Sequence, residues 1–303
     1  MRIIPYLLIG LLVLSSSLFA QENKSEIILS SEVITDIKTK NLDSRLSGIS
    51  GTIKYYDNII AHNDHYSSNL YILDSNYIII DSIITNLNFN DLEDITQDDN
   101  YIYLGDFGNN AKGNRQDLKI YRIEKSSIEK SKLKIDTIFF TYSNQTDFKA
   151  SRYSNWSDFD CEAMISIDSY LVLFSKQWLS YGTSIYFLPK TPGNHIAELK
   201  KNIDMVGLIT GATYLKETND VYLVGYSNLL MPFVLRIYDI KDKEFSEFKT
   251  SKFSLPLVAH QVESITHISD YKFLISNEYI SKFIITIPQK THIIDLENII
   301  KHQ

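Results

Sequence analysis

The chain has 303 residues, 44% hydrophobic and 22% charged, a composition that supports a folded core and excludes a wholly disordered protein. Its formal net charge is −7, whereas nucleic-acid-binding domains carry a basic surface, so we expect no nucleic-acid partner. A single cysteine excludes an internal disulfide framework and a cysteine-based zinc cluster.

Residues 1–20 have the pattern of a secretory signal peptide. Arg2 precedes an apolar run over residues 3–14, and small residues then lead to Ala20. The run is shorter than the ~20 residues of a membrane-spanning helix, which is the alternative interpretation. We therefore expect export to the periplasm or the exterior, cleavage after Ala20, and a mature chain of one domain, residues 21–303, without a membrane span.

Five later segments share one pattern of short β-prone runs. The first runs are residues 47–50, 93–96, 162–165, 211–214 and 263–266. The second runs are residues 58–64, 101–106, 171–176, 221–226 and 273–278, and the third runs are residues 70–73, 118–123, 184–188, 234–240 and 283–287. A fourth, looser run follows, for example at residues 78–84, 136–142 and 292–296. Helices are expected to be scarce.

Four strands that recur every ~40–50 residues are typical of the blades of a β-propeller, whose sheets bury their faces against one another around an axis. A β-sandwich is the alternative, but it does not explain why an acidic residue returns at the start of several units. We predict an all-β propeller of five four-stranded blades, or six if a divergent unit lies in residues 143–159 or 190–208. A strand at residues 27–37 is expected to join the last blade and close the ring.

The first strand of each blade lines the channel of a propeller, so Glu93, Glu162 and Glu263 are expected to meet near the axis, with Ser47 and Gly211 at the same position in the other two units. The ends of the second runs add polar side chains, namely His62, Asn63, Asp64, Asp106, Lys176, Asn277 and Glu278. Carboxylate and amide oxygens suit Ca²⁺, which takes about six to eight oxygen ligands, and Mg²⁺ is the weaker candidate. The alternatives are structural hydrogen bonding, pairing with Lys176 or Arg115, and direct catalysis.

The segment Gly105-Asp106-Phe107-Gly108-Asn109-Asn110 differs from the other blades. Its glycine and asparagine residues permit tight turns and left-handed backbone. Two interpretations remain open, a surface turn and a loop in which Asp106 and Asn109 or Asn110 present oxygens to a metal or ligand.

Several of these motifs, taken together, resemble a known family. The series Ser47-Gly48-Ile49, His62-Asn63-Asp64, residues 91–95, residues 105–110 and Ile120-Tyr121-Arg122 resembles a group of exported bacterial β-propellers with the pattern SGI…HNDSG…DWEDI…GDIGDN…IYR. Asp160-Cys161-Glu162-Ala163-Met164 is similar to the D-x-E-A-L motif of that group. The chain departs from the pattern at His65, at Leu92, which replaces a tryptophan, and in the fourth unit, which lacks the acid.

More distantly, the chain resembles the calcium-dependent propeller hydrolases of the gluconolactonase, paraoxonase and phytase-like types. That resemblance implies a Ca²⁺ ion held by Glu93, Glu162, Glu263, Asn63 and Asp106. It also implies that His62 or Asp64 acts as a base.

Three functions follow as hypotheses. The first is an exported, monomeric propeller that binds a small molecule or an envelope partner at the channel mouth through Asn109, Asn277, Glu278 and Lys176, with or without Ca²⁺. The second is a Ca²⁺-dependent hydrolase of lactones, esters or phosphoesters, and a purely structural module is a third. Cys161 is interpreted as a buried packing residue.

Overall fold

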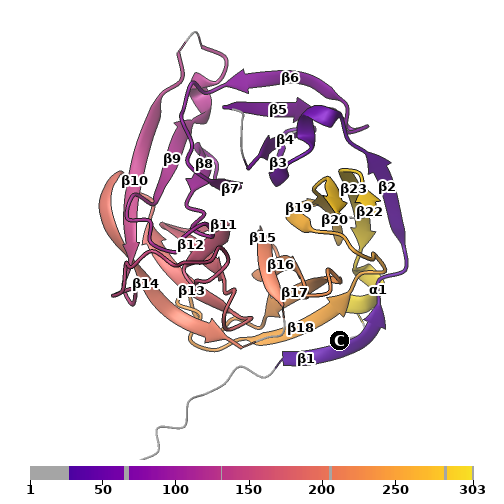
Figure 1. The fold of residues 1–303 in the computed structure, drawn as a ribbon. Coiled ribbons are helices and arrows are strands. Elements are labelled where there is room, and N and C mark those ends of the chain that lie inside the picture. Colours follow the sequence, from indigo (N-terminus) through magenta and orange to yellow (C-terminus); the bar gives the residue numbers. More distant parts are fainter. Residues whose placement is uncertain (1–26, 65–67, 131, 205–206, 283–284, 302–303) are drawn as a thin grey trace, which may run out of the picture.

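The computed structural model describes residues 27–64, 68–130, 132–204, 207–282 and 285–301. The signal peptide predicted at residues 1–20 lies outside the described residues. The described strands form five four-stranded units, arranged around an axis as the blades of a β-propeller (Figure 1).

Each unit pairs its strands antiparallel, in order from the axis outward. The first is β3 (Ile49–Tyr55), β4 (Asn58–Asn63), β5 (Asn69–Leu73) and β6 (Ile79–Ile84). The second is β7 (Leu92–Gln97), β8 (Tyr101–Asp106), β9 (Lys119–Glu124) and β10 (Ile135–Tyr142), and the third is β11 (Asp160–Ile167), β12 (Tyr170–Lys176), β13 (Thr183–Pro189) and β14 (Gly193–Ile203). The fourth is β15 (Leu208–Leu215), β16 (Asp220–Tyr226), β17 (Pro232–Tyr238) and β18 (Lys249–Ser254), and the fifth is β19 (Val262–Ser269), β20 (Lys272–Asn277), β23 (Lys290–Asp295) and β2 (Ile37–Asn41).

The hydrophobic core lies between neighbouring units. The inner strands are neighbours in the cyclic order β3, β7, β11, β15, β19 and back to β3. Each junction between two units has its own buried cluster, as with Ile60 and Ile102 between the first and second units, or Val172 and Val221 between the third and fourth. Because a blade buries both faces in this way, its second strand is buried along its length, as in β16, which confirms the propeller prediction.

The ring closes through the N-terminal segment, as expected, but by a different pairing. Strand β2 pairs antiparallel with β23 and completes the last unit. Strand β1 (Ile27–Val33), in contrast, pairs in parallel with β18 of the fourth unit, so the expectation that all of residues 27–37 join the last blade is wrong. A break in strand structure at residues 34–36 separates the two strands and lets them reach different sheets.

The last unit also differs from its predicted strand order. The described part of the predicted third run, residues 285–287, is not its third strand, because β21 (Ile280–Lys282) and β22 (Ile285–Ile287) form a separate hairpin. The predicted fourth run at residues 292–296 supplies the third strand, β23, and β2 takes the fourth position. The local apolar pattern is similar for both runs, so only the pairing partner distinguishes them.

The outer strands of the second and third units are also joined. Strand β14 is 11 residues long and pairs in parallel with β10, for example Gly193 with Ile138. Residues 143–159 contain no strand. The helical elements are short, namely η1 (Ser44–Leu46), η2 (Lys125–Ser127) and α1 (Glu297–Ile300). Among the described residues, no helix has the length and apolar character needed to cross a membrane.

Candidate functional site

Every inner strand carries a β-bulge at the same point, and the bulge positions one residue per unit. The residues left out of the pairing are Ser50, Glu93, Glu162, Thr210 and Glu263. A bulge leaves its extra residue outside the ladder and redirects its side chain, and bulges are frequent beside functional sites. The three glutamates are therefore structurally equivalent.

The equivalent residues in the other two units are Ser50 and Thr210, which corrects the expected Ser47 and Gly211. Ser50 Oγ donates a hydrogen bond to the Glu93 carbonyl (2.5 Å), and Thr210 Oγ1 donates one to the Val262 carbonyl (2.6 Å). In these two units the bulge residue therefore ties one blade to the next. The sequence pattern does not show these positions, because a bulge interrupts the two-residue alternation of a strand.

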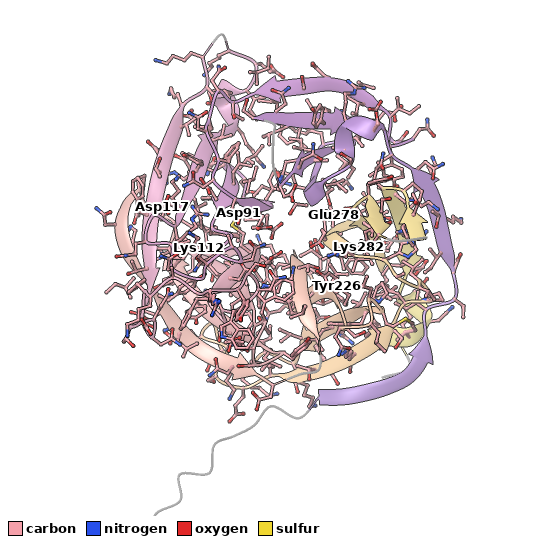
Figure 2. The ribbon with its side chains drawn as sticks, viewed as in Figure 1. Asp91, Lys112, Asp117, Tyr226, Glu278 and Lys282 are labelled. Atoms are coloured by element: carbon pink, nitrogen blue, oxygen red, sulfur yellow. The ribbon has the colours of Figure 1, made fainter. Side chains whose placement is uncertain are left out.

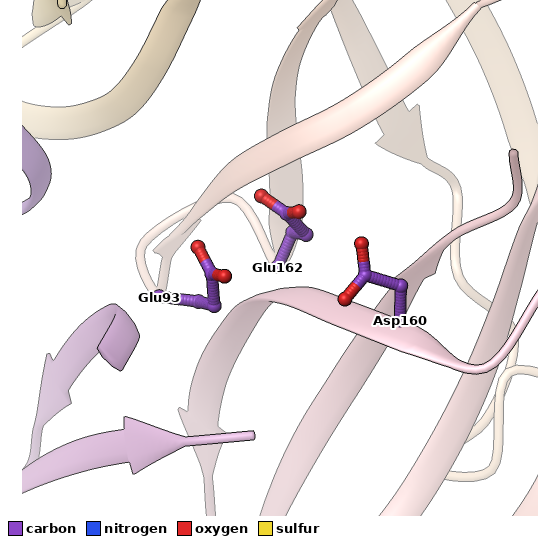
Figure 3. A group of neighbouring side chains, drawn as sticks. All are labelled: Glu93, Asp160 and Glu162. Atoms are coloured by element: carbon purple, nitrogen blue, oxygen red, sulfur yellow. The ribbon is translucent and has the colours of Figure 1, made fainter. Parts of the chain in front are cut away.

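Three buried carboxylates meet where the second and third units adjoin. Glu93 on β7 and Asp160 and Glu162 on β11 each place one oxygen within 4.8 Å of the others (Figure 3). Oxygen ligands on a shell of ~2.4 Å radius lie at most ~4.8 Å apart, so these separations are compatible with the ligands of one Ca²⁺ ion. We call these three residues the carboxylate group.

A second set of side chains surrounds the carboxylate group from the ends of the second strands. Asp64, Lys176, Tyr226 and Glu278 occupy equivalent positions in four units. Asp91, two residues before Glu93, borders the central opening from one side, and Tyr226 and Glu278 border it from the other (Figure 2). The mouth of the channel is therefore strongly acidic.

Burial in this acidic mouth raises the pKa of several carboxyl groups. Burial and the nearby Glu162 carboxylate raise the pKa of Glu93 well above its usual value, and burial also raises that of Glu162. Burial raises the pKa of Glu263 to about 7, and burial together with the Glu263 carboxylate raises that of Glu278 to about 9. For Asp91, burial and Asp160 raise the pKa to about 6. Several of these groups therefore keep their protons near neutral pH, and a bound cation would replace those protons.

Lys176 supplies a buried positive charge inside the acidic mouth. Its Nζ lies 3.1 Å from Glu162 Oε1, 4.6 Å from the centre of the Trp178 ring and 5.3 Å from that of Tyr226. Burial by itself lowers the pKa of Lys176, but the attraction of Glu162, together with Tyr226 and Glu263, raises it well above the usual value. The ammonium group therefore stays charged and offsets part of the negative charge.

Three of the predicted ligands, Asp106, Asn109 and Asn277, instead use their polar atoms to hold loops behind the mouth. Asp106 pairs with Arg115 (3.0 Å) and Lys119 (3.2 Å) and accepts hydrogen bonds from the amides of Asn90 and Asp91.

Asn109 uses its amide group in the same structural way. Its side chain accepts a hydrogen bond from the Arg115 backbone amide (2.9 Å) and donates one to the Phe159 carbonyl (3.0 Å). Its backbone amide donates to Asp160 Oδ1 (2.5 Å), which holds that carboxylate in the group.

The side chain of Asn277 is likewise engaged, with His292 Nε2 at 2.8 Å and the Glu278 and Pro288 carbonyls at 2.8 and 3.0 Å. The polar atoms of Asp106, Asn109 and Asn277 thus hold loops in place, and we assign these residues a supporting role.

The two neighbours His62 and Asn63 have different surroundings. His62 is fully buried, its Nδ1 lies 3.1 Å from the Asn63 carbonyl, and its Nε2 packs against Gly51 beside Ile95. Burial lowers the pKa of His62 to about 4, so the ring is neutral and enclosed between blades. Asn63 donates to the Arg45 carbonyl (2.7 Å), whereas its buried Oδ1 has no hydrogen-bond partner among the described residues. Asn63 pairs with Ile49 as Asp106 pairs with Leu92, so it has the same position in its strand as the supporting residue Asp106.

Asp91 and Asp160 belong to the site although they were not predicted as site residues. A signal for them was present, since Asp91-Leu92-Glu93 and Asp160-Cys161-Glu162 repeat the same D-x-E spacing in two units. In a regular strand residues i and i+2 share a face, but this spacing alone does not show that two strands bring their pairs together.

Gly108 explains why the loop after β8 departs from the other units. A Cβ atom at this position would lie 2.2 Å from Glu93 Oε1 and 2.5 Å from Asp91 Oδ2. We expect Gly108→Ala to displace both carboxylates, to destabilise the protein by about 1–3 kcal/mol and to weaken cation binding. Thermal unfolding and calorimetric titration measure these effects, with Asn110→Ala in the same loop as the control. An alanine variant with unchanged stability and cation affinity would show that the loop tolerates the added methyl group.

No family model matches the sequence, and no curated protein matches it. Solved structures with a similar chain path include a protein described as an oxidoreductase (glucose dehydrogenase) from Thermus thermophilus, with 7% identity, a TM-score of 0.48, and coverage of 86% of this chain and 100% of that one. Streptogramin B lyase has 10% identity, a TM-score of 0.42, and coverage of 88% and 100%. A protein described as exported, from Bacteroides fragilis, has 9% identity, a TM-score of 0.40, and coverage of 83% and 88%. The propeller assignment rests on the strand pairing and cyclic order described above.

Proposed function

We propose that the channel mouth binds a divalent cation, with Ca²⁺ as the best fit, and that the cation anchors a ligand there. The observation that carries this proposal is the carboxylate group, three buried side chains whose oxygens lie within 4.8 Å of one another. Ca²⁺ accepts irregular sets of oxygen ligands, whereas Mg²⁺ prefers octahedral geometry with several waters, which a buried acidic group does not favour.

The partial coordination shell is the reason to expect a ligand. With one oxygen from each side chain, three carboxylates provide fewer ligands than the about six to eight that Ca²⁺ takes. Asp91 at the rim is a further donor on the protein side. The remaining positions face the channel opening and suit water or a carboxylate, carbonyl or phosphoryl oxygen of a small molecule or protein partner.

We favour ligand binding over hydrolysis as the function because of the positions of the two candidate bases. Hydrolysis needs a base beside the cation as well as the cation itself. His62 is enclosed between Gly51 and Ile95, which leaves Asp64 as the candidate base at the mouth. We therefore describe the protein as an exported binding propeller, its export resting on the pattern of residues 1–20.

Calorimetric titration of Ca²⁺ into the purified protein tests the cation site. We expect one binding event that is weakened at least about tenfold in Glu93→Gln and in Glu162→Gln, because each change removes a charged ligand. Glu198→Gln, which alters an exposed partner of Lys200, is the control and should bind as the parent does.

The absence of binding at millimolar Ca²⁺, or equal binding by all four proteins, contradicts the proposal. Turnover of lactone, aryl-ester or phosphoester substrates by the Ca²⁺-loaded protein would replace binding by hydrolysis as its function.

A further inference from the structure

The end of the channel opposite the acidic mouth contains a cavity. On β7, Glu93 is the second residue and Gln97 the last, so four residues, or ~13 Å of extended strand, separate the acidic mouth from the other end. A cavity of about 430 Å³ lies at that end and is lined by residues of all five inner strands. This volume is in the range of about 300–1,000 Å³ that small-molecule sites occupy.

Each inner strand contributes one serine or threonine hydroxyl group to the lining of this cavity. The five residues are Thr52, Thr96, Ser166, Thr213 and Thr266. Thr52 and Thr266 bond to each other across the ring closure (2.6 Å), and Thr213 Oγ1 accepts a hydrogen bond from the His267 amide (3.4 Å). The hydroxyls of Thr96 and Ser166 line the cavity without a hydrogen-bond partner among the described residues, so they can bond to a ligand.

The charges around the cavity balance. Its charged lining residues are three lysines and three aspartates, namely Lys54, Lys190, Lys216, Asp98, Asp99 and Asp168. Lys190 Nζ bonds to Asp98 Oδ2 (3.1 Å) and to the Asp168 carbonyl (2.7 Å), which fixes donors and acceptors side by side. These six charges sum to zero, so the lining attracts ions less than the acidic mouth does.

We propose that this cavity binds a neutral saccharide of one or two sugar rings. A sugar carries many hydroxyl groups that both donate and accept hydrogen bonds, which matches a lining of hydroxyls, ammonium groups and carboxylates. Tyr214 adds an aromatic side chain to the lining, a surface against which the C–H face of a sugar ring packs. The site is separate from the cation site and does not depend on the proposed function.

Saturation-transfer NMR and calorimetry with glucose and maltose test this site, with glucose 6-phosphate as the charged comparison. We expect one of the neutral sugars to bind more tightly than the phosphate, and Thr96→Val and Ser166→Ala each to weaken that binding about fivefold, the typical effect of one lost hydrogen bond. Thr141→Val on outer strand β10 and Glu93→Gln at the opposite mouth are the controls, and both should bind sugar as the parent does.

Thermal unfolding shows whether the near-isosteric Thr96→Val and Ser166→Ala proteins are folded. The proposal is overturned if neither neutral sugar binds, if glucose 6-phosphate binds more tightly than both, or if folded Thr96→Val and Ser166→Ala proteins retain the parent affinity. Loss of Ca²⁺ binding in Glu93→Gln with unchanged sugar binding separates this site from the cation site.

Discussion

Without divalent cations, the melting temperature of the protein should fall as the pH rises from about 5 to about 9. Burial raises the pKa of Asp91 to about 6, of Glu263 to about 7 and, with the Glu263 carboxylate, of Glu278 to about 9. A carboxyl group whose pKa is higher in the folded state holds its proton more tightly there. Its contribution to stability is complete below the unfolded pKa and is lost as the pH rises through the folded pKa.

The size of this effect follows from the number of groups involved. Asp91, Glu263 and Glu278 titrate in this window, and at ~1.4 kcal/mol per pKa unit they should together lower the free energy of unfolding by several kcal/mol, or the melting temperature by at least about 10 °C. Ca²⁺ should reverse the loss, because binding to the ionised carboxylates stabilises only the folded state. An excess of about 100 Kd is equivalent to about 2.7 kcal/mol.

Scanning calorimetry at several pH values, with Ca²⁺ or with a chelator, measures both parts of this prediction. Glu263→Gln should show a smaller dependence on pH, since one of the titrating groups is then absent. Exposed Glu198→Gln is the matched control and should behave as the parent does. A melting temperature that is constant or rises between about pH 6 and 9 in chelator would show that Asp91, Glu263 and Glu278 do not retain their protons in the folded protein.

Replacing Lys176 by methionine should be among the most destabilising single changes in the protein. The Lys176 and Glu162 side chains are 5% and 4% exposed, and their charged atoms are 3.1 Å apart. Removal of one partner of a buried ion pair leaves the other charge without compensation, which costs about 3–5 kcal/mol. Here the penalty is increased because Glu263 and Asp160 also act on the ammonium group.

A double substitution tests whether the ion pair is responsible. In Lys176→Met with Glu162→Gln both charges are absent, so we expect the double variant to be more stable than Lys176→Met alone. Lys200→Met, which removes an ammonium group paired with the exposed Glu198 and Glu244, is the control and should have a small effect. Urea unfolding provides the comparison, and a double variant no more stable than Lys176→Met would attribute the loss to packing against Trp178 and Tyr226.

Lys176→Met also reports on the cation site. The ammonium group repels a divalent cation and neutralises Glu162, so its removal should tighten Ca²⁺ binding while it lowers stability in chelator. Opposite changes in stability and affinity are not expected from a purely structural residue.

The repeat made the fold predictable. Each unit contains the same series of short apolar runs, and these runs are sufficient to specify the four strands of a propeller blade. Residues 101–106 and 221–226 were both predicted as second strands and form β8 and β16 within a residue of those bounds. The pairing partner of residues 27–33 could not be predicted. Strand β1 pairs with β18, which lies more than 200 positions away in the sequence, and nothing in the sequence of β1 specifies that partner.

The candidate site was predictable in part for the same reason. Glu93, Glu162 and Glu263 occupy one repeated position in three of the five units. In a closed ring, equivalent residues of different units lie at the same distance from the axis. Asp106 and Asn277, which end second strands, were expected at the mouth. They face the supporting loops instead, whereas Glu278, the residue directly after β20, borders the channel opening. Successive side chains of an extended chain point to opposite sides. An error of one position in the predicted strand therefore assigns a supporting residue as a ligand, and a channel-facing residue as a supporting one.

The sequence by itself determined the all-β architecture, the four-stranded unit and the acidic character of the channel mouth, because these depend on local patterns and on their repetition. Only the tertiary structure decided which outer strand closes each sheet, where the bulges turn Glu93 and Glu162 toward Asp160, and how Lys176 comes to lie against both Trp178 and Tyr226. These features join residues from different units, and their energies arise from burial and charge at contacts that do not exist until the ring has formed.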